Sequence, residues 1–275
     1  MSSLMTLIRL TAARMRKLKD WFSGRRATSV GNLKRRRIDL GRAIPSYPIY
    51  VIGDVHGCLK ELNNAEAQIA ADINTSERAG PIVLLGDYVD RGPSSSQVLE
   101  YLIRPSEFGL KRLPLCGNHD DIFLKFLNEP ELYSEWLGLG GEQTLMSYGI
   151  DLHHLGVRQK YRNAKLSELL TEAVPDSHRQ FLADLPICLK IADLFFVHAG
   201  IRPGVPLDEQ DDEDMLWIRD PFLSEGPKLP VLVVHGHTPH PSLNLGPGRI
   251  GIDTGAYYTG NLTVLKIDGG RATVL

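Results

Sequence analysis

Residues 47–57 read YPIYVIGDVHG, an apolar run that ends in glycine and is followed at once by aspartate and histidine. The arrangement returns twice, as PIVLLGDYVDRG at residues 81–92 and as LPLCGNHD at residues 113–120. Short apolar runs closed by glycine are typical of buried strands. The three segments that follow these runs have helical periodicity: 58–73, 94–103 and 120–127. Strand and helix in alternation predict right-handed βαβ units and a mainly parallel sheet.

The rest of the chain changes character twice. Residues 128–185 are mostly helical in period, with Pro175 at an expected helix start, and we interpret them as an inserted helical cap. The segments after this cap have strand composition and are separated by turn signals: 187–191, 194–197, 231–234, 249–252, 262–267 and 272–275. The fold class is therefore α/β, and we expect one globular domain over residues 47–275.

The amino-terminal segment differs in charge from this domain. Residues 1–42 carry twelve Lys and Arg and two acids, which leaves 19 bases and 31 acids in the rest of the chain. Apolar residues between 4 and 22 share one helical face, so this segment fits either a membrane-surface anchor or a leader that packs on protein. The run Arg35–Arg37, with Gly41 and Pro45 after it, predicts that residues 1–46 form a tail and linker. The acidic domain disfavours nucleic acid as a partner.

Three cysteines without CxxC spacing argue against a disulfide framework and favour a reducing compartment. Arg9, Arg14 and Arg16 interrupt the apolar stretch that a secretory signal would need. We therefore expect a cytoplasmic protein with peripheral membrane contact through residues 1–42.

Two later predicted strands also end in histidine-containing turns, HAG at residues 198–200 and HGHT at residues 235–238. The carboxyl ends of the strands in an open α/β sheet line one crevice, so we expect all five segments to converge. Six side chains of metal-ligand type would then meet: Asp54, His56, Asp87, Asn118, His198 and His237. Six oxygen and nitrogen ligands with one shared carboxylate suit two divalent cations about 3.5–4 Å apart. The absence of cysteine from the set disfavours structural zinc.

Each motif has an ordinary structural explanation when it is taken alone. A lone buried histidine usually serves packing, GNHD also fits a turn with a helix cap, and Asp-Arg-Gly fits a surface ion pair. His235 shares the face of His237 on its strand, and we interpret it as a packing residue. Five such motifs in order, each at a strand end, are not explained by packing.

The series GDVHG, GDYVDRG, GNHD, HAG and HGHT resembles the phosphoprotein phosphatase family within the calcineurin-like metallophosphoesterases, and its bacterial and phage members most of all. The resemblance covers about residues 47–265 and implies a four-layer αββα sandwich with a dinuclear site at one edge. By the family pattern, Asp54, His56 and Asp87 hold the first metal, and Asp87 bridges to the second. Asn118, His198 and His237 complete the second site.

The resemblance also implies the catalytic residues. The family's general acid falls on His119, and its supporting carboxylate falls on Asp90. Arg91 and Arg219 are implied to grip the phosphate, with Asn118 as a further contact. Eukaryotic members read GNHE where this chain has GNHD.

These residue types suit the chemistry on their own account. A metal-bridging hydroxide can attack phosphorus at neutral pH, and a leaving alkoxide then needs a proton from a group such as His119. Asp90 would fix the tautomer of that histidine. Arginine matches phosphate with a two-pronged fork, which Arg91 and Arg219 would supply. We expect two divalent ions, Mn²⁺ first, although Fe, Zn and Co accept the same ligands.

The sequence therefore predicts a metal-dependent phosphomonoesterase that acts on phosphorylated protein side chains, phospho-Ser/Thr first and phospho-Tyr second. The alternative enzyme is a symmetrical dinucleoside-polyphosphate hydrolase. Those enzymes typically lack the aspartate of Asp-Arg-Gly and carry GHW, whereas this chain has Asp90 and Thr238. A generic phosphodiesterase often ends in GHxH, and here position 239 is Pro239. A non-catalytic phosphate-binding scaffold would lack a ligand or His119, and none is missing.

Overall fold

The computed structural model describes residues 34–152 and 159–275. The chain separates into two compact units, Met1–Lys34 and Arg35–Leu275. The amphipathic helix predicted between residues 4 and 22 lies outside the described residues, so the anchor within residues 1–42 stays a prediction.

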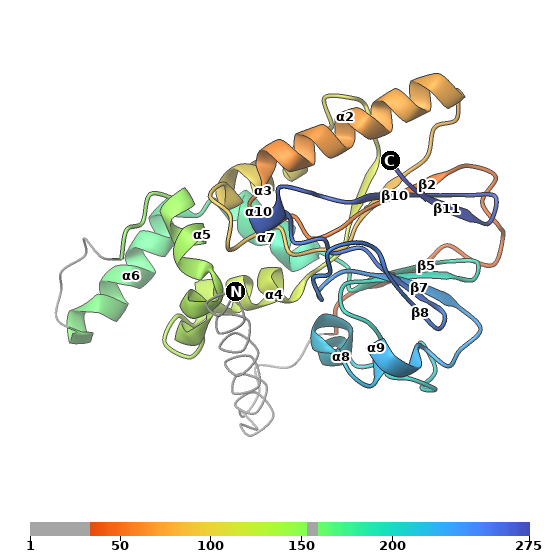
Figure 1. The fold of residues 1–275 in the computed structure, drawn as a ribbon. Coiled ribbons are helices and arrows are strands. Elements are labelled where there is room, and N and C mark those ends of the chain that lie inside the picture. Colours follow the sequence, from red (N-terminus) through yellow and green to blue (C-terminus); the bar gives the residue numbers. More distant parts are fainter. Residues whose placement is uncertain (1–33, 153–158) are drawn as a thin grey trace, which may run out of the picture. The chain divides into compact units, whose positions relative to one another are not determined.

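Two mixed sheets form the centre of this unit, one drawn in warm and dark-blue strands and the other mainly in green and light-blue ones (Figure 1). The five-stranded sheet has the order β11–β10–β2–β3–β4, and the six-stranded sheet has the order β1–β5–β6–β7–β9–β8. The first sheet comprises β2 (Ile49–Ile52), β3 (Ile82–Leu84), β4 (Arg112–Pro114), β10 (Val264–Asp268) and β11 (Arg271–Val274). The second comprises β1 (Arg37–Asp39), β5 (Cys188–Ile191), β6 (Leu194–Val197), β7 (Leu232–His235), β8 (Asn244–Gly246) and β9 (Arg249–Gly251).

The parallel βαβ core that the sequence predicts corresponds to β2, β3 and β4, which pair in parallel. Parallel pairing also joins β1 to β5, β6 to β7 and β7 to β9, but antiparallel pairs stand between and beside these strands. Strand β10 joins β2 antiparallel, and β5 pairs antiparallel with β6. The late strands therefore do not extend a single sheet. They complete one sheet and build most of a second.

Helices lie outside the two sheets. Figure 1 shows α2 (Leu59–Ser76) along the five-stranded sheet, and α8 (Asp212–Trp217) and α9 (Phe222–Glu225) beside the six-stranded sheet. This arrangement confirms the predicted αββα sandwich. The other helices are α3 (Ser95–Ile103), α4 (Asn118–Asn128) and α10 (Ala256–Thr259) together with those of the insertion. None of the helices in the described part of the chain has the length and apolar composition needed to cross a bilayer.

The main core lies between the sheets and takes residues from both. Val51 and Val83 come from the five-stranded sheet, and Phe196 and Val234 come from the six-stranded sheet. Strands covered on both faces are apolar at successive positions, as IYVI in β2 shows. The three cysteines Cys58, Cys116 and Cys188 are buried free thiols.

Residues 35–46, predicted as a linker, are built into the domain. Strand β1 pairs in parallel with β5, with Ile38 opposite Leu189. Arg35 donates through Nη2 to Asp121 Oδ1 at 2.9 Å and through Nη1 to the carbonyls of Leu182 and Leu185. A row of three basic residues looks like a solvated linker. The tertiary structure instead supplies a carboxylate and two carbonyls to the first of them.

The insertion 128–185 contains η1 (Ser134–Leu139), α5 (Gly141–Ser147), α6 (Gln159–Ala173) and α7 (Asp176–Asp184). Helix α7 begins directly after Pro175, where the sequence predicts a helix start. Both α5 and α7 contact α3, and α7 also contacts α4. The insertion is therefore packed against the helices that follow the predicted site motifs.

Candidate dinuclear metal site

The structure brings the six predicted metal ligands together in one buried pocket. They lie at the ends of β2, β3, β6 and β7 and at the start of α4, so both sheets contribute. Each is exposed by 5% or less: Asp54, His56, Asp87, Asn118, His198 and His237. Polar side chains buried to this degree need partners, and an array of this composition suits cations.

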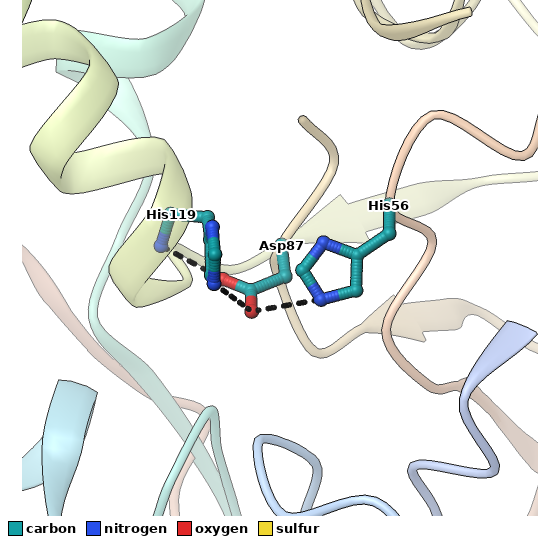
Figure 2. A group of neighbouring side chains, drawn as sticks. All are labelled: His56, Asp87 and His119. Atoms are coloured by element: carbon teal, nitrogen blue, oxygen red, sulfur yellow. Dashed lines mark hydrogen bonds and ion pairs between the residues drawn. The ribbon is translucent and has the colours of Figure 1, made fainter. Parts of the chain in front are cut away.

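The carboxylate of Asp87 lies at the centre of the pocket. Its Oδ2 is 3.4 Å from His56 Nε2, and its Oδ1 is 3.4 Å from His198 Nε2. Figure 2 shows the rings of His56 and His119 pointing toward this carboxylate from two different segments. The histidines form two groups, His56 with His119 and His198 with His237. Asp87 presents one oxygen to each group, so it could be shared by two cations.

A second group of ligand atoms meets around Asn118. Its Oδ1 lies 2.8 Å from His198 Nε2 and 2.9 Å from His237 Nδ1. In the described part of the chain, the buried Nδ2 of Asn118 and Nε2 of His237 have no hydrogen-bond partner. Asp87, His198 and His237 place ligand atoms within 4.8 Å of one another, and so do His56, Asp87 and His119. The donors present therefore fit two cations that share Asp87.

Backbone groups orient these ligands. His56 Nδ1 lies 2.9 Å from Val89 O, and His198 Nδ1 lies 2.9 Å from Leu85 O. A ring that donates from Nδ1 to a carbonyl keeps the lone pair of Nε2 directed into the pocket. Asp54, which belongs to neither group of three, receives the His237 N–H on Oδ2 at 2.9 Å. This contact ties the loop after β2 to the loop after β7.

Asp120 connects two of the loops. Its carboxylate accepts the backbone N–H groups of Asp87 and Tyr88, each at 2.8 Å, and that of Gly117 at 2.9 Å. The GNHD motif is therefore both a helix cap and a source of site residues. The cap fixes the position of the loop that carries Asp87.

Several site residues have a left-handed backbone, which is uncommon outside glycine. The φ values are 45° for His56, 56° for Asp87, 72° for Asp90, 67° for Arg91 and 66° for His237. Such residues each cost on the order of 1–3 kcal/mol and cluster at functional sites. Gly236 is required for another reason, since a Cβ there would lie 1.9 Å from Asp54 Oδ1.

Burial shifts the pKa values of the carboxyl and imidazole groups in the site toward their neutral forms. It raises the pKa of Asp54, helped by the nearby Asp253 and Asp87 carboxylates, and raises the pKa of Asp87 to about 7. Burial also lowers the pKa of His198 to about 4 and that of His237 well below its usual value. A bound cation would stabilise the crowded carboxylates in their ionised form, and it would bind histidines that are neutral, as these are.

His119 and Asp90 form a hydrogen-bonded pair beside the ligands. His119 Nδ1 lies 2.6 Å from Asp90 Oδ2. The same carboxylate receives Trp136 Nε1 and Thr144 Oγ1, each at 2.7 Å. Burial raises the pKa of Asp90, and the bonds from Thr144 and Trp136 oppose that rise. The pair turns His119 Nε2 toward the pocket, where Arg91 Nη2 lies 2.9 Å away.

The sequence reading did not identify Trp136 and Thr144 as supporting residues. Trp136 is fully buried and stacks on Phe123 with ring centroids 5.0 Å apart. No local pattern marks either residue. The one available signal was a tryptophan within a helical insertion, whose indole N–H needs a partner when it is buried.

Trp136→Phe is expected to lower turnover of phosphoserine about tenfold, in the range of supporting-residue effects, and turnover of diadenosine tetraphosphate by less. The phenyl ring keeps the stack on Phe123 and Phe126 but removes the N–H that holds Asp90. Steady-state kinetics would measure the loss on phosphoserine and on diadenosine tetraphosphate, with Phe126→Leu as the control for packing. Equal losses on the two substrates, or the same losses in the control, would show that Trp136 only packs.

The two predicted phosphate-gripping arginines also lie at this pocket. Arg91 donates from Nη1 to His56 Nε2 at 2.8 Å, and its backbone N–H donates to Gly140 O in the insertion. Arg219 is partly buried. Its pKa is lowered mainly by this burial and to a smaller extent by the neighbouring charge of Arg91. Asp253, which the sequence reading missed, is buried near both arginines and raises the pKa of Arg219.

Comparison with known proteins identifies relatives of this chain. A family model described as calcineurin-like phosphoesterase matches residues 47–269. A symmetrical bis(5'-nucleosyl)-tetraphosphatase of Hamiltonella defensa is 28% identical over 195 residues, which are 70% of this chain and 57% of that protein. The enzyme of the same name from Nitrosococcus oceani is 30% identical over 131 residues, 46% of this chain and 43% of that one. The chain thus spans about half the length of these curated relatives.

Solved structures show the same fold at low identity. A candidate diadenosine tetraphosphatase has a TM-score of 0.58 at 22% identity, covering 88% of this chain and 97% of that one. The cold-active protein-tyrosine phosphatase of a psychrophilic Shewanella has a TM-score of 0.52 at 18% identity, covering 85% and 80%. The family model extends over most of the unit that holds both sheets and the pocket. The chain belongs to the calcineurin-like phosphoesterase family.

Proposed function

We propose that this metal-dependent phosphoesterase hydrolyses dinucleoside tetraphosphates symmetrically, giving two nucleoside diphosphates. The observation that carries the proposal is the buried cluster centred on Asp87, with an arginine near each histidine group. The names of the curated relatives support this substrate. On sequence alone a phosphoprotein came first and a dinucleoside polyphosphate second, and the comparisons support the reverse order.

The protein's own residues account for binding and orientation. Two divalent ions, Mn²⁺ first among the candidates, would be held by the ligands around Asp87 and Asn118 and would supply a nucleophilic hydroxide and a polarised phosphoryl group. Arg91 directs its guanidinium into the pocket, where it can meet non-bridging phosphate oxygens with two N–H groups. Arg219 contributes a second positive charge near His237.

A second substrate class, a phosphorylated protein side chain, is supported by the Asp90–His119 pair. An alkoxide leaving from phosphoserine is strongly basic and needs a proton, whereas a nucleoside diphosphate leaves as a stable anion. Asp90 holds His119 Nδ1 at 2.6 Å and leaves Nε2 facing the pocket. A fixed imidazole of this kind suits the more difficult leaving group.

A direct competition between substrates tests the proposal. The full chain would be assayed with Mn²⁺, Zn²⁺ or Co²⁺ on diadenosine tetraphosphate and on phosphoserine and phosphotyrosine peptides. We expect kcat/KM to be at least about tenfold higher for the dinucleotide, with ADP as the only nucleotide product. Efficient peptide dephosphorylation with an uncleaved dinucleotide would favour the second class. AMP and ATP as products would contradict symmetrical cleavage.

A further inference from the structure

A partly exposed tyrosine stands beside the first histidine group. Tyr257 is 41% exposed, its ring centroid is 5.6 Å from that of His56, and the Arg91 guanidinium carbon lies 5.1 Å from its centroid. It lies in α10, a four-residue helix with a left-handed glycine at each end, Gly255 and Gly260. Thr259 Oγ1 closes this turn by donating to Thr254 O at 2.9 Å. The ring is therefore held on a braced loop next to a phosphate-binding arginine.

A second aromatic residue stands beside the other histidine group. Trp217 ends α8, is partly exposed, and has its ring centroid 6.2 Å from that of His237 in an edge-on arrangement. Ile218 after it is extended and buried, so Trp217 and Arg219 flank a residue that points into the core. Arg219 lies close enough to His237 that its charge, after burial, is the largest influence on that imidazole's pKa, which it lowers. Each histidine group thus has one aromatic ring and one arginine at its side.

We propose that Tyr257 and Trp217 stack on the two nucleobases of the substrate, one on each side of the metal-ligand cluster. Every base has a flat π-face, and its stacking on an aromatic side chain is sequence-tolerant. When the phosphate chain of a dinucleotide lies across the cluster, one base extends beyond the cluster at each end of the chain. This inference rests on the proposed function, and it explains why a ring and an arginine accompany both groups.

Binding of the product tests the stacking without turnover. Isothermal titration of the Mn²⁺-loaded chain would compare ADP with methyl diphosphate, which has the same phosphates and no base. We expect ADP to bind at least about tenfold more tightly, as base–aromatic stacking allows. Tyr257→Ala and Trp217→Ala should each reduce this advantage, and the double variant should remove it. Tyr257→Phe and Trp217→Phe should retain most of it.

Hydrolysis gives a second readout. In Tyr257→Ala and Trp217→Ala, the KM for diadenosine tetraphosphate should rise about tenfold with kcat nearly unchanged. Tyr47→Ala is the matched control, because Tyr47 is a similarly exposed tyrosine (39%) before β2, whereas the site follows that strand. Circular dichroism of each variant would show whether the fold is intact.

The outcomes separate this inference from the proposed function. If the wild-type chain binds ADP no more tightly than methyl diphosphate, the stacking is wrong even where the dinucleotide is cleaved. If the ADP advantage is present and lost in the alanine variants while the dinucleotide stays uncleaved, the stacking holds and the proposed reaction fails. The wild-type chain could instead show no ADP advantage and prefer phosphotyrosine over phosphoserine peptides. If Tyr257→Ala removed that preference, the ring would contact a peptide, and the proposal that it stacks on a nucleobase would be wrong.

Discussion

Asp87→Asn is expected to reduce turnover by at least about a thousandfold and to weaken the binding of both metal ions. Asp87 places one oxygen 3.4 Å from His56 and the other 3.4 Å from His198, so it faces a histidine of each group. An amide carries no charge and offers a single, weaker oxygen donor, so it would hold two cations poorly. Metal catalysis is worth several kcal/mol, and each 1.36 kcal/mol corresponds to a factor of ten in rate. Steady-state kinetics and Mn²⁺ titration calorimetry would measure the two effects.

A matched control uses Asp72, which lies outside the pocket and pairs with Tyr50 and Lys266. Asp72→Asn removes one carboxylate charge as well, and it should leave metal affinity unchanged. If Asp87→Asn lost one metal ion and kept the other at wild-type affinity, Asp87 would not be shared between the two groups.

His119→Asn is expected to affect substrates according to their leaving groups. General acid catalysis contributes about 10²- to 10⁴-fold, so hydrolysis of a phosphoserine peptide should fall by that factor. Cleavage of diadenosine tetraphosphate should fall less than about tenfold, because the diphosphate leaves without a proton. Rates on both substrates, together with Mn²⁺ affinity, would be compared between wild type and variant.

His119 Nε2 lies 4.0 Å from Asp87 Oδ2 and groups with His56, so His119 could itself be a metal ligand. Measuring metal affinity distinguishes this role from that of a general acid. Unchanged Mn²⁺ binding is expected if His119 transfers a proton. Loss of one metal ion would make it a ligand instead. The exposed His240, replaced by Asn, serves as the control, and near-normal phosphoserine hydrolysis by His119→Asn would require a different acid.

The local sequence pattern predicts much of the fold and most of the residues that line the pocket. Glycines at the ends of β2 and β3 mark where the chain turns, and the polar residues that follow them are those found together in the pocket. Such features can be predicted because strand, turn and ligand type are all written within a few residues of one another. The carboxyl-end rule for parallel strands then supplies the convergence.

The supporting contacts could not be predicted because they join distant segments. Asp90 receives its bonds from Trp136 and Thr144, which lie 46 and 54 residues later in the insertion. Arg35 reaches Asp121 across 86 residues, so a basic run that looked solvated became part of the domain. Periodicity reports which face of an element is buried, but it does not identify the element that covers that face.

The origin of the ligands in two different sheets links metal binding to folding. Asp54, His56 and Asp87 follow strands of the five-stranded sheet, whereas His198 and His237 follow strands of the six-stranded sheet. Separating the sheets would divide the ligand set, so the unfolded chain should have little affinity for the ions. A ligand that binds only the native state adds about 2.7 kcal/mol to its stability at one hundred times the dissociation constant. The melting temperature of this protein should therefore rise with metal concentration and fall when a chelator is added.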